Sequence, residues 1–251
     1  MHREMSLENL VSDAEELVAF LCKRFQQKKV VIVCHSFGSY IGMHLVKRMP
    51  ESIHTYIGIG QIVNWEKTNI VRYRHLYACA EKKKDNSLKH RLEERGKQHK
   101  NEKYSEDYAD FLLMELANTE GEAGMHLLTW NRANKIPAYR KLVSPHLNWR
   151  DLFNNTFGEK PALYNNDYQR FINQVRAIDL PKELGDNFEV PIYFFTGEHD
   201  WQTPKTLIAE WFSRIKAPAK EMVWFENSAH FVVNEEPGKF ILALMHKVFP
   251  H

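Results

Sequence analysis

A serine that follows a short apolar run is the first residue of this chain that could act as a nucleophile. Ser36 lies in the motif C-H-S-F-G at residues 34–38, where a predicted strand ends and a predicted helix begins. The turn at such a junction is so tight that the positions two before and two after the serine must be small, which gives the usual pattern G-x-S-x-G. Gly38 fills the second of these positions, and Cys34 fills the first with a somewhat larger side chain. The pattern predicts a serine hydroxyl lifted above the edge of a sheet.

A nucleophilic serine needs a base, and the base needs an acid that orients it. Asp200 follows a predicted strand that ends at Thr196, and His230 follows a predicted strand that ends at Phe225. Both residues therefore lie at the carboxyl edge of the sheet, where open α/β sheets bind their ligands. The chain order serine, acid, histidine is the order expected for a triad in this architecture. We predict Ser36 as nucleophile, His230 as base and Asp200 as the orienting acid.

Two neighbouring side chains are alternatives to this acid and this base. Glu198 is a rival acid, but Asp200 lies nearer to the next helix start and has the shorter side chain. His199 is a rival base, but it is too close to the acid in sequence to lie opposite Ser36. Because the chain has 13 histidines, the prediction depends on the combination of three residue types at three strand ends, not on any one histidine.

These residues require a parallel sheet covered by helices. Apolar residues at steps of three and four from Leu7 to Phe25 predict a helix with Ser6 as its N-cap. Buried strands are predicted at 30–34, 53–60, 190–196 and 221–225, and further helices at 38–49, after the N-cap Thr203, and from Pro237. The alternation predicts an α/β fold with a mostly parallel sheet, because parallel strands need crossover helices.

A long segment without clear strands separates the second and third predicted strands. Residues 62–187 are rich in helix formers and aromatics, which predicts a helical cap inserted into a core made of residues 1–61 and 188–251. Within it, residues 82–103 hold nine Lys or Arg and four Asp or Glu. We interpret this stretch as a solvated helix face, with an anion or nucleic-acid site as the alternative. The cap is expected to roof the site between Ser36 and Asp200.

Composition narrows the function classes. A chain of 251 residues with 43% hydrophobic residues and a net charge of +2 has no overall field that would attract nucleic acid or acidic lipid, so neither partner is expected. Three cysteines without CxxC spacing favour a reducing compartment, and no apolar run reaches the ~20 residues of a membrane span, which predicts a soluble, cytoplasmic protein.

The G-I-G at residues 58–60 lacks the third glycine of a dinucleotide fingerprint. The triad needs no cofactor and no metal.

The motifs around the three residues resemble those of the α/β-hydrolase superfamily, and in particular its proline iminopeptidase-like group. The resemblance rests on residues 35–39, on 195–204 around Asp200, and on 224–237 around His230, and it covers residues 1–61 and 188–251. It implies a serine hydrolase that cleaves an ester, a small amide or a short peptide. It also implies that the N–H of Phe37 is one donor of the oxyanion hole, the pair of N–H groups that binds the negative oxygen formed during the reaction.

One departure from the family pattern concerns the start of the chain. Family members begin with several further strands and an HGGPG-like loop that supplies the second oxyanion donor, whereas one helix precedes the first strand here. We therefore expect weak hydrolase activity, and the alternative is a catalytically weak or inactive hydrolase-like protein that binds a ligand or partner. The first strand is expected to form an exposed edge that a second copy of the chain covers.

A second departure concerns the substrate. The proline iminopeptidases resemble one another in a cap segment of the type W-x-x-W-E, whose acid helps to hold the free amino group of the substrate. Here Asn131 follows Trp130 in place of that acid. Asn131 therefore argues against aminopeptidase specificity, although Glu115, Glu120 and Glu122 are nearby acids that could substitute. The expected enzyme class is thus an esterase or an aminopeptidase-like serine hydrolase.

Overall fold

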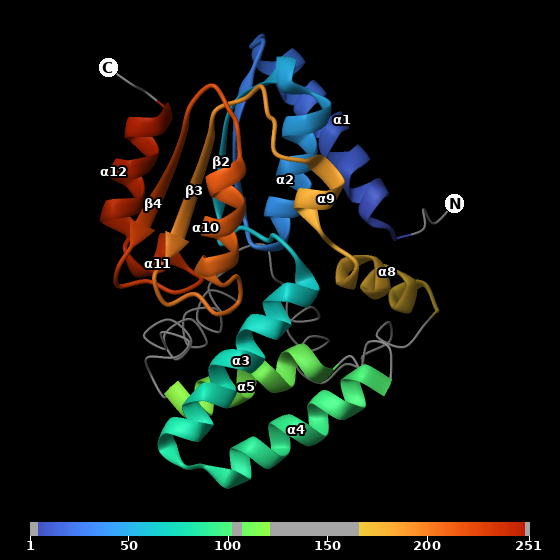
Figure 1. Ribbon diagram of the computed structural model, residues 1–251. Helices are drawn as coiled ribbons and strands as arrows, with labels where there is room; N and C mark the ends of the chain where they lie inside the picture. The colour runs from blue at the N-terminus through green and yellow to red at the C-terminus, as the bar shows by residue number, and fades with distance from the viewer. Residues whose placement is uncertain (1–4, 102–106, 121–165, 249–251) are drawn as a thin grey trace, which may run out of the picture.

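Four parallel strands form one sheet in a computed structural model that describes residues 5–101, 107–120 and 166–248. The strands are β1 (Val30–His35), β2 (Ile53–Ile59), β3 (Ile192–Gly197) and β4 (Lys220–Phe225). They lie in the order β1-β2-β3-β4, and each neighbouring pair is parallel (Figure 1). The predicted α/β class with a parallel sheet is confirmed.

Helices cover both faces of this sheet, because successive side chains of its strands alternate between two apolar layers. Tyr56 and Phe194 pack in one buried cluster with α1, α2, α9 and α10, while Ile57 and Phe195 pack in another with α11 and α12. The helices are α1 (Leu7–Phe25), α2 (Phe37–Arg48), the 3-10 turn η1 (Pro50–Ser52), α9 (Leu180–Leu184), α10 (Lys205–Arg214), α11 (Val232–Glu235) and α12 (Pro237–Val248). Ser6 caps α1 as predicted, since its hydroxyl accepts from the N–H of Asn9 at 3.1 Å.

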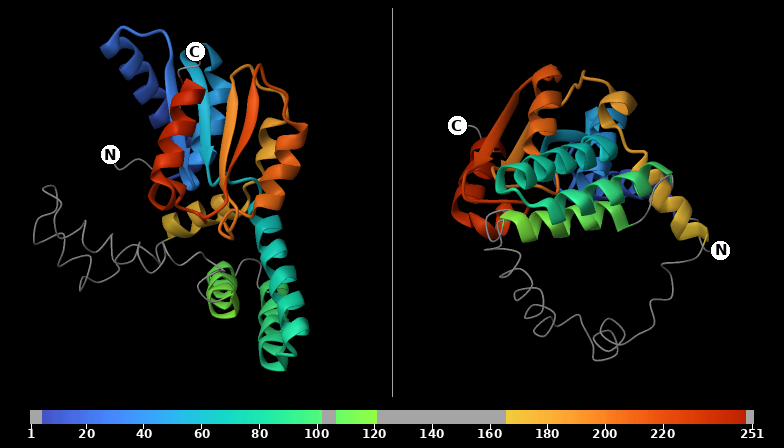
Figure 2. Two further views of the ribbon diagram at one scale, coloured as in Figure 1. Left: turned by 90° about the vertical axis from the view of Figure 1, so that its left-hand side faces the viewer. Right: turned by 60° about the horizontal axis from the view of Figure 1, so that its bottom comes forward.

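Most of the described chain between β2 and β3 is helical. Its longer helices are α3 (Trp65–Lys83), α4 (Asn86–Asn101), α5 (Asp107–Glu120) and α8 (Asn166–Arg176). They lie beyond the sheet edge toward which the strand arrows point, and α3, α4 and α5 share an apolar cluster of their own (Figures 1 and 2). This helical segment therefore stands at the carboxyl edge, where the predicted site residues follow their strands. Its division into a cap of residues 62–187 stays a prediction.

No helix among the described residues is long and apolar enough to cross a membrane.

Two local predictions were wrong. Thr203 does not cap α10, because its hydroxyl donates to the carboxylate of Asp200 at 2.6 Å and Pro204 takes the N-cap position. The strand at 30–34 is not buried on both faces, since Val33 is 45% exposed. The second result follows from position: β1 pairs with β2 along one edge, and within the described residues nothing pairs with its other edge.

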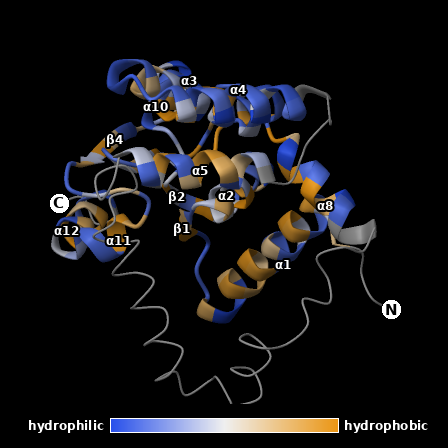
Figure 3. Cartoon of the chain, turned by 90° about the horizontal axis from the view of Figure 1, so that it is seen from below, coloured by the Kyte–Doolittle hydropathy of each residue, from blue (hydrophilic) through white to orange (hydrophobic). Residues whose placement is uncertain are grey.

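The open side of β1 is flanked by apolar helix faces. Seen from below in Figure 3, β1 lies between α11 and α12 on one side and α1 on the other. Large exposed apolar side chains gather on these helices: Leu17, Phe20 and Phe25 on α1, and Ile241, Leu242 and Met245 on α12. An unpaired strand edge beside apolar surface is a template for pairing with another chain.

We propose that a second copy of the chain covers this edge. Sedimentation velocity at micromolar concentration is expected to give a dimer, because two β1 edges can pair about a two-fold axis. Val33→Lys places a charge on the edge and is expected to shift the protein to a monomer. A wild-type protein that sediments as a monomer at this concentration would contradict the proposal.

Candidate active site

The turn that carries Ser36, the predicted nucleophile, lies between β1 and α2. Ser36 has φ 54° and ψ −122°, a backbone conformation that residues with a side chain rarely adopt. The larger Cys34 fits at the first small position of the motif because a glycine faces it one turn along α2. A Cβ on Gly42 would lie 2.5 Å from the Cys34 Sγ, whereas a Cβ on Gly38 would meet no described atom within 4 Å. The space that the motif requires is thus supplied partly by Gly42.

Backbone and side-chain hydrogen bonds fix the serine from both sides. The N–H of Ser36 donates to the carbonyl of Ile59 at 2.9 Å, which ties the turn to the end of β2. The hydroxyl of Ser39, which is fully buried, donates to the carbonyl of Ser36 at 2.5 Å and accepts from the N–H of Ile62 at 2.9 Å. Ser39 is thus a supporting residue that the sequence analysis did not identify.

Asp200 lies just after β3 with its carboxylate buried and fully engaged. Its Oδ1 accepts from the N–H groups of Gln202 at 2.8 Å and Thr203 at 2.9 Å, and its Oδ2 accepts from the Thr203 hydroxyl. Burial by itself raises the pKa of this carboxyl, but the charge of His230 and the hydrogen bonds from His230 and Thr203 outweigh it, so the pKa of Asp200 lies below its usual range. The residue is an anion in the folded protein.

His230 follows β4 and lies between the other two predicted residues. Its Nδ1 is 2.9 Å from Oδ2 of Asp200, and its Nε2 is 2.8 Å from Oγ of Ser36. An ionised carboxylate can only accept, so Nδ1 carries the proton and Nε2 accepts from the serine hydroxyl. The structure therefore brings Ser36, His230 and Asp200 into one chain of hydrogen bonds.

The loop that carries His230 is held by groups outside this chain. Nε2 of His35, the residue before the serine, donates to the carbonyl of His230 at 2.8 Å. Burial first, and then the charge of His230, lower the pKa of His35, which keeps its ring neutral. Oε2 of Glu235 accepts from the N–H of Ala229 at 2.7 Å, and Oε2 of Glu236 accepts from the Ser228 hydroxyl at 2.7 Å.

Glu235 makes the stability of this loop depend on pH. Burial raises the pKa of its carboxyl from 4.5 to about 7, and the nearby Asp200 carboxylate adds to the shift. The folded protein therefore binds this proton more tightly than the unfolded chain does. The linked stability is fully present below the unfolded pKa and is lost as the pH rises through about 7.

The variant Glu235→Gln tests this linkage, because glutamine still accepts from the Ala229 N–H but cannot ionise. We expect the melting temperature of the variant to match that of the wild type near pH 5 and to exceed it increasingly toward pH 8. Glu236→Gln, a change of the same kind in the same loop, is the control for the exchange of a carboxylate for an amide. A difference for Glu235→Gln that stays constant with pH would contradict the argument.

Gly60 closes the space behind the imidazole. It has φ +55°, and a Cβ at this position would lie 2.9 Å from both Cε1 and Nδ1 of His230 and 3.3 Å from Oδ2 of Asp200. The second glycine of the G-I-G at residues 58–60 is therefore explained by its contact with His230 and not by a nucleotide motif. The backbone at Gly60 must approach the histidine too closely for any side chain.

The rival acid is paired elsewhere. Glu198 pairs with Lys205, whereas the carboxylate that pairs with His230 is that of Asp200. Phe37, the predicted oxyanion donor, is the first residue of α2, so its N–H belongs to the turn that has no acceptor within the helix.

Among the described residues no three His, Cys, Asp or Glu side chains are grouped to hold a metal ion.

Of the acids considered for an amino group, Glu115 is described and is already paired. Nε and Nη2 of Arg91 each donate to its carboxylate at 2.9 Å, and the Glu115 side chain is 10% exposed. The side chain of Glu120 and residues 122 and 127–131 lie outside the described part of the chain. Arg91 belongs to the basic stretch of residues 82–103, where Lys89 and Lys97 likewise pair with glutamates.

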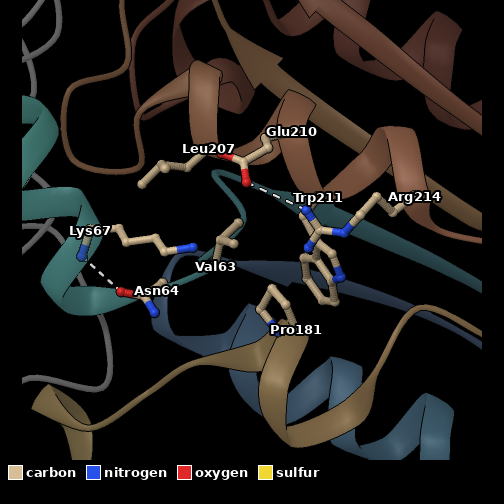
Figure 4. Close-up of a pocket in the computed structure, with 8 residues that line it drawn as sticks. All are labelled: Val63, Asn64, Lys67, Pro181, Leu207, Glu210, Trp211 and Arg214. Atoms are coloured by element: carbon tan, nitrogen blue, oxygen red, sulfur yellow. Dashed lines mark hydrogen bonds and ion pairs between the residues drawn. The ribbon is translucent and has the colours of Figure 1, made fainter.

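A small hollow lies apart from these residues (Figure 4). It is bounded by the start of α3 with Lys67, by Pro181 of α9, and by Trp211 and Arg214 of α10. Two of its charged groups pair with each other, since Arg214 lies 3.4 Å from Glu210. None of its lining residues is Ser36, Asp200 or His230, so the hollow is not part of the candidate site.

Comparison with known proteins agrees with this architecture. A family model described as "Alpha/beta hydrolase family" matches residues 4–244. The protein named "Probable aminopeptidase YbaC" from Bacillus subtilis (strain 168) is 23% identical over 255 residues, which cover 95% of this chain and 71% of that protein.

Solved structures resemble the chain at lower identity. MGS-M2, an alpha/beta hydrolase enzyme from a Medee basin deep-sea metagenome library, superposes with a TM-score of 0.57 at 12% identity over 100% of this chain and 74% of its own. The enol-lactonase from Burkholderia xenovorans LB400 superposes with a TM-score of 0.51 at 17% identity over 97% and 73%. These two similarities concern the fold.

Proposed function

The chain belongs to the alpha/beta hydrolase family, and from that premise we propose that it is a serine hydrolase that cleaves an ester or small amide bond through Ser36, His230 and Asp200. One observation carries the proposal. His230 lies 2.8 Å from the Ser36 hydroxyl through Nε2 and 2.9 Å from the Asp200 carboxylate through Nδ1. This is the geometry of a nucleophile with its base, and of a base with its orienting acid.

The first half of the reaction acylates the serine. Oγ of Ser36 attacks the carbonyl carbon of the substrate while its proton passes to Nε2 of His230. The carbonyl oxygen becomes negative, and the N–H of Phe37 at the start of α2 donates to it, aided by the positive end of the helix dipole. The intermediate then collapses, and the leaving alcohol or amine takes the proton from Nε2.

The second half releases the acyl group. Water gives a proton to Nε2 of His230 and attacks the acyl carbon, and Ser36 regains its proton as the acid product leaves. Asp200 keeps its charge throughout, because its hydrogen bonds hold it as a carboxylate beside the imidazolium that forms twice per cycle.

The proposed substrate is a small ester or amide without a required free amino group. The aminopeptidase name of the Bacillus relative suggests aminoacyl substrates. Against these stands the pairing of Glu115 with Arg91, which leaves this acid unsuited to hold an ammonium group. Asn131 at the position of the family's acid argues in the same direction.

Parallel assays on two substrate series test this proposal. We expect purified protein to hydrolyse p-nitrophenyl acetate and butyrate faster than the p-nitroanilides of proline, alanine and leucine. A preference for the aminoacyl anilides would replace the proposed substrate class by that of an aminopeptidase. A folded protein that cleaves neither series would contradict the proposed activity.

A further inference from the structure

A buried arginine from the helical segment lies against the loop of the proposed acid. Arg72 of α3 is only 5% exposed, and a guanidinium so deeply buried must be paired. Its Nε donates to the carbonyl of Trp201 at 2.8 Å, and its Nη2 donates to the carbonyl of Gln202 at 2.7 Å. Nη1 donates to Oδ1 of Asn69 on the same helix at 2.9 Å. Arg72 thus binds two consecutive peptide groups just after Asp200.

The same two peptide groups donate to the proposed acid. The peptide between Trp201 and Gln202 has its carbonyl on Arg72 and its N–H on Oδ1 of Asp200 at 2.8 Å. The peptide between Gln202 and Thr203 has its carbonyl on Arg72 and its N–H on the same Oδ1 at 2.9 Å. Each peptide dipole therefore points its negative end at the cation and its positive end at the anion. In a buried site such hydrogen bonds polarise one another and strengthen together.

The charges around this arrangement are consistent with a cation at Arg72. Burial lowers the pKa of Arg72 to about 10, and the carboxylates of Asp200 and of Asp110 on α5 oppose that shift. The guanidinium is therefore charged at neutral pH.

Two further titratable groups face the acid and base from other elements. The ring of His35, at the end of β1, lies 4.7 Å from the ring of His230. The carboxyl of Glu235 on α11 interacts electrostatically with both Asp200 and His230. Neither of these groups contacts the two peptides that Arg72 holds, according to the hydrogen bonds of the described residues.

We propose that Arg72 is a positioning residue for the triad: through two peptide groups it holds the Asp200 carboxylate ionised and aimed at Nδ1 of His230. The effect on turnover rests on the proposed function. Helix α3 therefore contributes to the proposed site itself, since Arg72 binds the loop that follows the proposed acid.

Two variants distinguish the effect of the positive charge of Arg72 from the effect of its several N–H donors. Arg72→Gln removes the charge and one of the two carbonyl contacts, while Arg72→Lys keeps the charge but can reach one carbonyl only. Arg74→Gln is the matched control, because Arg74 is exposed on the same helix. Circular dichroism and melting temperature establish which variants are folded.

The first readout is the NMR resonance of the proton on Nδ1 of His230, which needs no substrate. It is assigned in 15N-histidine-labelled protein by its loss in His230→Gln. We expect the resonance to move upfield in Arg72→Gln, to move less in Arg72→Lys, and to stay in place in Arg74→Gln. If only Arg72→Lys folds, it carries the comparison. An unchanged resonance in whichever Arg72 variants are folded would overturn the proposal.

The second readout is the pH profile of ester hydrolysis. With its carboxylate held less firmly, the protonated imidazole is less stabilised, so the acidic limb of kcat/KM should move to lower pH. We expect kcat to fall about 10- to 100-fold, by analogy with residues that orient the ligands of a metal site, with a smaller change in KM. If a variant of Arg72 yields less folded protein, but the folded part keeps the wild-type pH profile of kcat/KM, Arg72 has a structural role only. A wild type without activity would defeat the proposed function, while the proton resonance would still test Arg72.

Discussion

Ser36→Ala is expected to abolish ester hydrolysis with little change in the fold. Removing the nucleophile of a comparable triad lowers kcat by about 10⁶-fold, so activity should fall to the background of the assay. The reason is geometric, because the Ser36 hydroxyl is the group within 2.8 Å of Nε2 of His230. The residue is partly exposed, and alanine accommodates the same backbone bonds to Ile59 and Ser39, so the melting temperature should change little. The measurement is kcat/KM for p-nitrophenyl butyrate.

The control for this experiment is Ser213→Ala, which removes a hydroxyl from the exposed face of α10. It is expected to leave kcat/KM unchanged. Hydrolysis that survives in purified Ser36→Ala at the wild-type rate would show that another group performs the reaction, and the mechanism would have to be abandoned.

Gly60→Ala is expected to lower kcat by about 10²-fold or more while leaving the serine, histidine and acid in the sequence. The new Cβ would lie 2.9 Å from Cε1 and Nδ1 of His230, closer than carbon atoms approach, so the imidazole must shift. A displacement of about 1 Å in a catalytic group costs about 10²-fold in rate. The hydrogen bonds from His230 to Ser36 and Asp200 lengthen together, which reduces proton transfer more than substrate binding. Steady-state kinetics with p-nitrophenyl butyrate should therefore show the loss in kcat.

Gly185→Ala is a matched control for the backbone effect of this substitution. Gly185 also has a positive φ, of +70°, but a Cβ there would meet no described atom within 4 Å. Both variants should lose some stability, because alanine is strained at positive φ, but only Gly60→Ala should lose activity. Equal activity in the two variants at equal folded fraction would refute the claim that Gly60 makes room for the imidazole.

The sequence alone predicts where the three proposed site residues lie in the fold, because the ends of buried strands are easy to recognise. Buried apolar runs place Ser36, Asp200 and His230 after three strands, and parallel strands bring their carboxyl ends to one edge. The structure then adds the distances. The N-cap of α1 at Ser6 was likewise predictable, because capping depends on a side chain and its local backbone.

Predictions fail where a local signal competes with a contact from elsewhere in the fold. Thr203 followed by Pro204 has the pattern of a helix cap, but the threonine hydroxyl is drawn to the Asp200 carboxylate, a charged acceptor. The apolar run at 30–34 predicts a strand buried on both faces, yet Val33 of β1 is 45% exposed. Composition reports what a strand can bury, not what lies beside it.

Other supporting residues leave no trace in the sequence. Arg72 is one of 34 lysines and arginines, and neither its spacing nor its neighbours distinguish it from exposed ones. Gly60 could be read as part of several glycine motifs, and its role depends on His230, which is far away along the chain. Ser39 looks like an ordinary helical serine until the carbonyl of Ser36 is placed beside it. These roles arise from long-range packing, which only the folded structure supplies.

Covalent labelling with a fluorophosphonate probe tests the central claim most directly. Such a probe reacts with a serine hydroxyl that a neighbouring base has activated, so it reports the assembly of Ser36 and His230 without knowledge of the substrate. Purified, folded protein should be labelled at Ser36, as located by peptide mass spectrometry, and both Ser36→Ala and His230→Ala should remain unlabelled. Folded wild-type protein that takes up no label, or label that persists at Ser36 in His230→Ala, would contradict the account.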